Sequence, residues 1–182
     1  MRALFPSRTA PCPLASLPQR ALRPVFALVL SLSLIFALGA MPLQAAELGK
    51  REGWVVAESH KPYDTLLQDL LNAVKDEGLI VVTQAGPTKA AAARGITIPG
   101  NRVIGVFNND YALRVLELST AAMIEAPIRF YVTEVESDHT HLAYKRPSHV
   151  FSSYLDEGGS QLLRISVELD RRFAKIAEQA LK

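Results

Sequence analysis

The stretch from residue 128 to residue 146, Ile-Arg-Phe-Tyr-Val-Thr-Glu-Val-Glu-Ser-Asp-His-Thr-His-Leu-Ala-Tyr-Lys-Arg, predicts two strands joined by a tight turn. Pro127 precedes it, a position at which proline begins a strand without costing a central ladder hydrogen bond. β-Branched and aromatic residues fill both arms, and Ser137-Asp138 between them has the composition of a turn. We therefore expect strands at 128–136 and 139–146, paired as a hairpin.

Three more strands are expected upstream, at 54–58, 79–83 and 102–107, where short apolar and β-branched runs recur. Helices are expected directly after Pro62, from about 110 to 119, and from Ser160 onward, because apolar residues repeat there at helical spacing. Residues 85–100 read as a loop with room for a short helical turn at 89–94, and a second loop follows Pro147.

The resulting order is β-α-β-β-α-β-β-α. Strands in hairpins with helices between them predict an α/β (α+β) two-layer sandwich, with a largely antiparallel five-stranded sheet and its helices on one face. A strand that is exposed on one side should alternate apolar and polar residues, yet 79–82 and 103–107 are apolar on both sides. We therefore expect the second face to be covered by a second subunit or by a ligand, with a homodimer favoured.

Residues 1–46 differ in composition from the rest of the chain. They contain four arginines, no acidic residue, an uninterrupted apolar run at 25–38, and small residues after it. This pattern predicts a signal peptide that is cleaved after Ala45 or Ala46, with an uncleaved anchor as the alternative. We expect a single domain at 47–182, periplasmic or secreted, that makes no membrane contact after cleavage.

Removal of this leader changes the charge of the chain. The full sequence has 20 basic and 18 acidic residues, but four of the basic residues lie in the leader, so the mature domain is near −2. The basic character of the full sequence is therefore no argument for nucleic-acid binding. The only cysteine, Cys12, also lies in the leader, so the mature domain offers neither a disulfide nor a thiol.

Three motifs together resemble a known family. They are Val-Ile-Gly-Val-Phe-Asn-Asn-Asp-Tyr-Ala-Leu-Arg at 103–114, Glu-Ala-Pro-Ile-Arg-Phe-Tyr-Val-Thr-Glu at 125–134 and Tyr-Lys-Arg-Pro-Ser-His-Val-Phe-Ser-Ser-Tyr at 144–154. In order and spacing they resemble the bacterial family catalogued as domain of unknown function 302, over residues 54–181. The resemblance implies a compact two-layer α/β sandwich that forms a dimer. It implies no established reaction, cofactor or catalytic residue.

The chain departs from that family's pattern at two places. Many members have Asn-Pro where this chain has Asn108-Asn109, and Pro-Cys where it has Pro127-Ile128. The second position therefore offers no thiol here. We expect no cofactor and assign no catalytic residue, because the sequence contains no nucleophile elbow, zinc-protease helix or dinucleotide fingerprint.

One face of the predicted hairpin suggests a binding site. If the turn is two residues long, Tyr131 lies opposite Tyr144 and Arg129 lies opposite Arg146. Like charges placed directly opposite each other are unfavourable unless an anion or an acidic partner sits between them. Two arginines beside two tyrosines would suit a small anionic or aromatic ligand. The alternative is that the arginines pair with carboxylates of this chain or of a partner subunit.

The other face of the hairpin carries two histidines. His139 and His141 face the same way, and the same register places Glu136 opposite His139 and Glu134 opposite His141. Such a set can hold zinc or copper. The alternative, which we favour, is an exposed hairpin tip with good charge pairing and no tight metal site.

Two further positions are candidates for ligand contact. His149 is either a ligand-binding or acid–base group beside Tyr154, or a surface residue of a loop. Asn108 either helps to hold an anion at a helix start or only caps that helix. The leading hypothesis is an exported binding protein. An enzyme that acts on a small anionic substrate, with His149, Tyr154 and Arg129 in one cleft, and a periplasmic metal-binding protein are the alternatives.

Overall fold

The computed structural model describes residues 48–182, so the predicted leader lies outside the described residues. The described chain forms one sheet whose order is β1-β5-β4-β3-β2, and every neighbouring pair is antiparallel. Its strands are β1 (Trp54–Ser59), β2 (Ile80–Ala85), β3 (Asn101–Phe107), β4 (Ile128–Glu136) and β5 (His139–Lys145). The strand at the start of the domain therefore pairs with the last one, and β2 forms the other edge.

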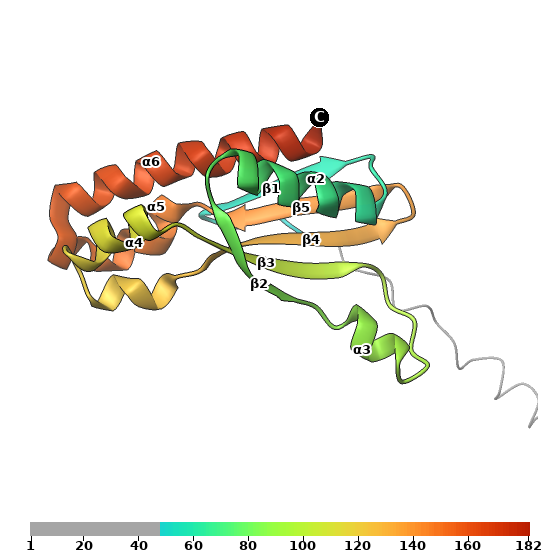
Figure 1. Ribbon diagram of the computed structural model, residues 1–182. Coiled ribbons are helices and arrows are strands. Elements are labelled where there is room, and N and C mark those ends of the chain that lie inside the picture. Colours follow the sequence, from blue (N-terminus) through green and yellow to red (C-terminus); the bar gives the residue numbers. More distant parts are fainter. Residues whose placement is uncertain (1–47) are drawn as a thin grey trace, which may run out of the picture. The chain divides into compact units, whose positions relative to one another are not determined.

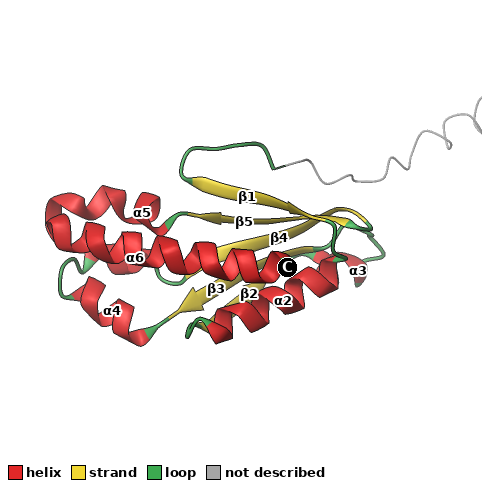
Figure 2. Cartoon of the chain, turned by 90° about the horizontal axis from the view of Figure 1, so that it is seen from above, coloured by secondary structure: helices red, strands yellow, loops and turns green. Residues whose placement is uncertain are grey.

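Two long helices, α2 (Tyr63–Asp76) and α6 (Leu155–Leu181), lie side by side on one face of this sheet (Figures 1 and 2). The predicted fold class, a two-layer α/β sandwich on a largely antiparallel five-stranded sheet, is confirmed. Within α6 the helical conformation breaks at Gly159, whose φ of 54° is one that glycine adopts readily. The long regular part of this helix thus begins at about Ser160, as the sequence predicts.

Short helices occupy the connections. The expected turn in the 85–100 loop is α3 (Thr88–Ala92), and the second expected helix is α4 (Asn109–Leu116). The segment from Pro147 onward, expected as a loop, instead contains two short helices. A third short helix precedes β4, and these three helices lie at one end of the sheet (Figure 2). They are η1 (Ala121–Glu125), α5 (Pro147–Val150) and η2 (Phe151–Tyr154).

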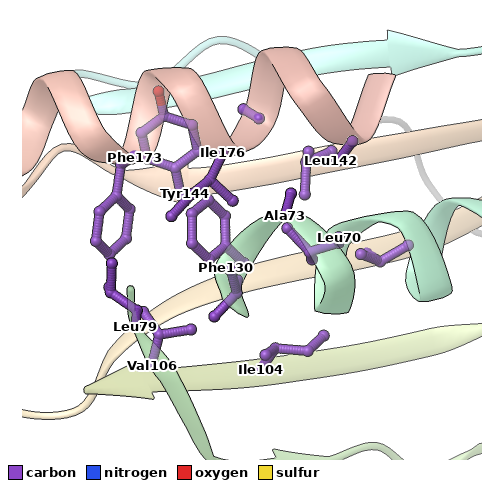
Figure 3. Close-up of a cluster of buried hydrophobic side chains, with 14 of the residues drawn as sticks. Leu70, Ala73, Leu79, Ile104, Val106, Phe130, Leu142, Tyr144, Phe173 and Ile176 are labelled. Atoms are coloured by element: carbon purple, nitrogen blue, oxygen red, sulfur yellow. The ribbon is translucent and has the colours of Figure 1, made fainter. Parts of the chain in front are cut away.

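The main core lies between the sheet and the two long helices (Figure 3). The ring of Phe130 on β4 stacks on that of Phe173 on α6 with centroids 4.6 Å apart, and the Tyr144 ring on β5 lies 5.3 Å from Phe130. All three side chains are buried. A second apolar cluster, which includes Tyr111, Phe151 and others from α4, η1 and η2, packs against the first half of α6.

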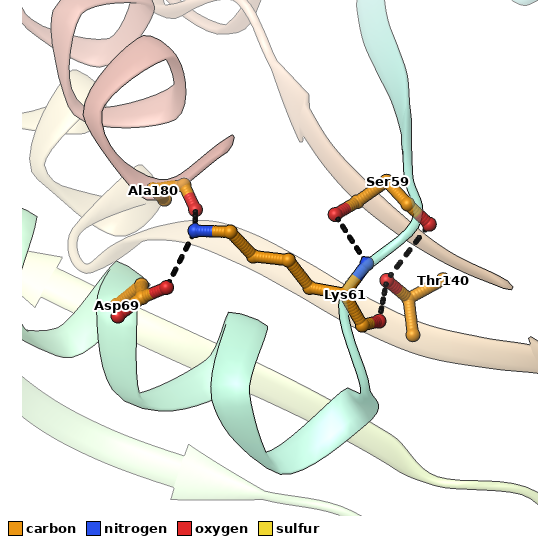
Figure 4. A network of polar contacts seen from close by, with 5 residues as sticks. All are labelled: Ser59, Lys61, Asp69, Thr140 and Ala180. Carbon is orange, nitrogen blue, oxygen red and sulfur yellow. Dashed lines mark hydrogen bonds and ion pairs between the residues drawn. The ribbon is translucent and has the colours of Figure 1, made fainter. Parts of the chain in front are cut away.

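A lysine ties the ends of the helices to the sheet (Figure 4). The Nζ of Lys61 lies 2.6 Å from Asp69 Oδ2 on α2 and donates to the Ala180 carbonyl at the end of α6, 2.9 Å away. The hydroxyl of Thr140 on β5 donates to the Lys61 carbonyl (3.1 Å). The β1–α2 connection is thereby fixed to the C-terminus of α6, where a positive charge is favourable to the helix dipole.

Neither of the two long helices covers the opposite face of the sheet, called the open face below (Figure 1). Strand β2 at its edge has no charged residue, and Ile80 and Val82 on it are 53% and 46% exposed. None of the described helices has the length and apolarity to cross a membrane.

Candidate functional site

The pairing of β4 with β5 decides which side chains reach the open face. Phe130 pairs with Tyr144 and Tyr131 with Ala143, so the predicted pairing of Tyr131 with Tyr144 is wrong by one residue. The cause is an irregularity between Glu134 and Glu136, where an extra residue interrupts the ladder. The turn has the expected length, but this bulge shifts everything beyond it by one position, which exchanges the two faces.

A groove of about 730 Å³ lies on the open face, at the end where β1 begins and β5 ends. Its floor is made by alternate residues of four strands: Trp54, Val103, Arg129, Tyr131, Ala143 and Lys145. Its wall comes from three short helices at that end of the sheet: Glu125, His149, Val150 and Ser153. A volume of this size is within the range of about 300–1,000 Å³ that is common for small-molecule sites.

Two cations lie side by side on the floor of this groove. Because Phe130 pairs with Tyr144, the next step of the ladder brings Arg129 beside Lys145. Both side chains are exposed, and neither takes part in an ion pair within the described residues. The sequence thus led us to expect a like-charged cross-strand pair at this place, but the partner of Arg129 is Lys145 and not Arg146.

Two aromatic rings flank these cations. Trp54 pairs with Lys145 across β1 and β5, and the Lys145 Nζ lies 5.7 Å from the centroid of its ring. The guanidinium carbon of Arg51 lies 5.5 Å from the same ring. On the other side, Tyr131 accepts a hydrogen bond from the Asn101 side-chain amide, which fixes its hydroxyl. The groove therefore combines positive charge with flat apolar surfaces.

The wall of the groove holds one carboxylate and one imidazole. Tyr154 donates its hydroxyl to Glu125 Oε1 at 2.8 Å, and this hydrogen bond raises the pKa of Tyr154. Tyr154 is therefore a donor at neutral pH and not a base. His149 is exposed, and its ring lies against the Cα of Gly53, where any Cβ would collide with it. Glycine at position 53 therefore leaves room for the His149 ring, and its φ of 72° is one that glycine adopts readily.

Of the remaining predicted ligand contacts, Tyr144 borders the groove but turns its ring away from it, and Arg146 and Asn108 do not line it. Burial raises the pKa of Tyr144, and its ring is in the core on the helix side of the sheet. Arg146 is at the N-cap position of α5 without a side-chain capping hydrogen bond, and its backbone N–H donates to the Gly53 carbonyl at 2.8 Å. Asn108 accepts from the N–H groups of Asp110 and Tyr111 as a helix cap, and it borders an apolar cavity of about 50 Å³.

The two hairpin histidines are not at an exposed tip. The bulge turns Glu134 to the helix side, where it accepts from the Gly100 N–H at 2.7 Å, so it does not oppose His141. His141 pairs with Glu58 on β1 and Thr133 on β4 and is only 2% exposed. Its ring centroid lies 5.3 Å from that of His139. The predicted pairing of Glu136 with His139 is confirmed.

Several residues of the groove were missed by sequence reasoning, among them Trp54, Asn101, Glu125 and Lys145. The sequence did indicate Lys145 as an alternative, because it lies between Tyr144 and Arg146 and a register shift of one residue brings it to the open face. Trp54 was recognised as part of a strand, but nothing local showed that β1 would pair with β5. Glu125 comes from a short helix that carries no clear periodic pattern.

Comparison with known proteins agrees with the fold. A family model described as "Domain of unknown function DUF302" matches residues 55–180. A solved structure, described as "Crystal structure of uncharacterized conserved protein DUF302 from Bacillus stearothermophilus", aligns with a TM-score of 0.62 and 18% sequence identity. The alignment covers 71% of this chain and 99% of that one. No curated protein matches the chain significantly.

Proposed function

This chain belongs to the family described as "Domain of unknown function DUF302", and from its own groove we propose that it is an exported protein that binds a small anionic ligand with a flat apolar part. The observation that carries the proposal is the pair of neighbouring cations, Arg129 and Lys145, on the floor of a groove of about 730 Å³. The rest of the groove supplies the apolar contact.

Electrostatics favours an anion between these two side chains. Like charges on neighbouring strands destabilise a sheet unless a counter-charge sits between them. The ring of Trp54 attracts Lys145 without neutralising its charge, because a cation–π contact leaves the net charge unchanged. A carboxylate that bridges Arg129 and Lys145 would gain charge-assisted hydrogen bonds from both and would remove their repulsion.

The flat part of the ligand follows from the residues on either side. Trp54 and Tyr131 flank the cations, and Val103 and Ala143 complete an apolar floor. A planar ring on this floor would bury apolar surface, which favours binding in proportion to the area removed from water, as it does in a protein core. Acetate has the charge without the ring and benzamide has the ring without the charge, so benzoate is the matched probe.

Calorimetric titration with these three compounds tests the proposal. We expect benzoate to bind at least about tenfold more tightly than benzamide or acetate, with an affinity that falls as salt is raised. Arg129→Gln should lower the affinity for benzoate about tenfold and should leave the affinity for benzamide unchanged. Arg164→Gln, an exposed arginine outside the groove, is the control. Equal binding of benzoate and benzamide, or an equal loss in the control variant, refutes the proposal.

An enzyme is the second candidate, because Glu125 and His149 line the same groove as the two cations. A carboxylate held by Tyr154 and an accessible imidazole are suitable for proton transfer to a bound anion. Small molecules extracted from the organism can be incubated with the wild-type protein and with Glu125→Gln and followed by mass spectrometry. Conversion by the wild type alone favours the enzyme, and retention without conversion favours the binding protein.

Export is part of the proposal and rests on the leader. Its composition predicts a mature chain that begins at Ala46 or Glu47. The intact mass of protein from the periplasmic fraction tests this. If the chain keeps residues 1–46 and sediments with membranes, the leader is an uncleaved anchor and not a cleaved signal peptide.

We also propose that the chain forms a homodimer through the open sheet face near β2. The supporting observation is the uncharged edge strand on which Ile80 and Val82 are half exposed. Large apolar side chains at an unpaired edge strand favour strand or sheet contact with a second copy. Such a dimer would place the ligand groove beside the interface.

A further inference from the structure

Three of the four histidines of the chain gather at the opposite end of the open face from the groove. His139 and His141 come from β5, and His60 follows β1, its neighbour in the sheet. We propose that this cluster, with Glu58, is a binding site for a divalent transition-metal ion of the kind that prefers imidazole nitrogen, such as Cu²⁺ or Zn²⁺. The proposal is independent of the ligand groove.

The spacing of His139 and His141 suits two ligands of one ion. Their ring centroids are 5.3 Å apart and their planes are nearly perpendicular, at 80°. A metal–nitrogen bond of about 2.0–2.1 Å in tetrahedral geometry places the centroids of two coordinated imidazoles roughly 5 Å apart. The backbone of a single strand fixes both residues, so this spacing does not depend on a flexible loop.

A carboxylate and a third imidazole stand beside the pair. Glu58 Oε2 lies 4.0 Å from His139 Nε2, and the side chain of Glu58 is largely exposed. The ring of His60 stacks on that of His139 with centroids 6.1 Å apart. As they stand, the described side chains contain no set of three such groups converging on one point. The exposed His60 must therefore turn from its stacked position to complete the site.

His141 supplies an independent reason to expect a ligand. Its Nδ1 is enclosed and has no hydrogen-bond partner among the described residues. A buried imidazole nitrogen without a partner costs free energy, and coordination to a metal would satisfy it. Our sequence-based expectation of no tight site assumed an exposed hairpin tip. The burial of His141 and the approach of His60 remove the basis of that expectation.

The experiment is a titration of the untagged protein with Cu²⁺ and with Zn²⁺, followed by calorimetry, and for Cu²⁺ also by electron paramagnetic resonance. We expect one ion per chain, with Cu²⁺ bound more tightly than Zn²⁺ as the Irving–Williams order requires. The Cu²⁺ spectrum should show hyperfine coupling to imidazole nitrogen.

Single substitutions identify the ligands. His139→Gln should lower the affinity for both ions at least about tenfold, and His60→Gln should lower it by a smaller factor. These two side chains are accessible, so the variants remain informative if His141→Gln fails to fold. His149→Gln removes the one histidine outside the cluster and is the matched control. A loss below about threefold in His139→Gln, or an equal loss in His149→Gln, means only scattered surface binding and overturns the proposal.

Discussion

Trp54 and Lys145 are partners in the β1–β5 ladder, and the Lys145 ammonium lies 5.7 Å from the centroid of the indole ring. Trp54 is the only tryptophan of the chain, and it lines the proposed ligand groove. The tryptophan fluorescence of the protein therefore reports on the groove. Any anion that draws Lys145 away from the ring changes the surroundings of this one fluorophore.

The first prediction uses this reporter. Saturating benzoate should change the intensity and the emission maximum of Trp54, with a midpoint that agrees with calorimetry. Lys145→Gln should raise the benzoate concentration at the midpoint of this change by about tenfold, because one of the two cations is lost. A spectrum that does not respond at concentrations that saturate the calorimetric signal would place benzoate outside the groove.

The second prediction concerns the core. Phe130 is fully buried and its ring contacts those of Phe173 and Tyr144. Phe130→Ala should lower the free energy of unfolding by about 3–5 kcal/mol, because it removes a large buried ring and leaves a cavity. Denaturation with urea measures this. Leu113→Ala, at a side chain that is 60% exposed, is the control and should change stability by less than about 1 kcal/mol. Equal losses in the two variants would contradict the packing described.

The third prediction concerns the stability of the fold at acidic pH. The Lys175 ammonium, 2.7 Å from Glu77 Oε1, lowers the pKa of Glu77, and hydrogen bonds from Tyr111 and Arg114 lower the pKa of Glu168. A carboxylate with a depressed pKa stabilises the fold above its unfolded pKa of about 4.3 and loses this contribution as pH falls through the folded value.

The wild-type protein should therefore lose stability as the pH falls below about 4.3. The double variant Glu77→Gln/Glu168→Gln should be less stable at pH 7 and should approach the wild type in acid. Urea denaturation at a series of pH values measures both curves. Parallel curves over the whole range would show that these two carboxylates do not carry the acid sensitivity.

The fourth prediction concerns the homodimer. Light scattering after size exclusion should give twice the mass of the chain. Tyr131→Glu, with its side chain on the open face, should dissociate the dimer if the interface reaches the centre of that face, because it would bury an unpaired charge. A monomer at every accessible concentration contradicts the dimer. If the dimer persists in both Tyr131→Glu and Ile80→Lys, its interface lies on another surface.

The elements of the fold could be predicted from the sequence because their signals are local. Pro62 and the apolar spacing after it mark α2, and the β-branched runs mark the strands. The pairing of β1 with β5 brings together residues about 90 positions apart, and no local pattern specifies it. Sequence reasoning therefore gave the layers but not the neighbours of Trp54.

The candidate site could be predicted only in part because it depends on one bulge. The interruption between Glu134 and Glu136 has no glycine or proline to mark it, yet it decides which of Tyr131 and Tyr144 faces the groove. Arg129 and Tyr131 were identified correctly as residues of one surface. The Tyr144 ring belongs to the other side, Arg146 lies beyond the end of β5, and Lys145 between them takes the expected place of Arg146.

The most direct test of the central proposal is a crystal structure of the protein grown with 4-iodobenzoate, whose iodine can be located by anomalous scattering. The proposal predicts iodine in the groove beside Trp54 and Tyr131, with the carboxylate between Arg129 and Lys145. Iodine at another site, or a groove that stays free of the compound at concentrations far above the calorimetric dissociation constant, would contradict it.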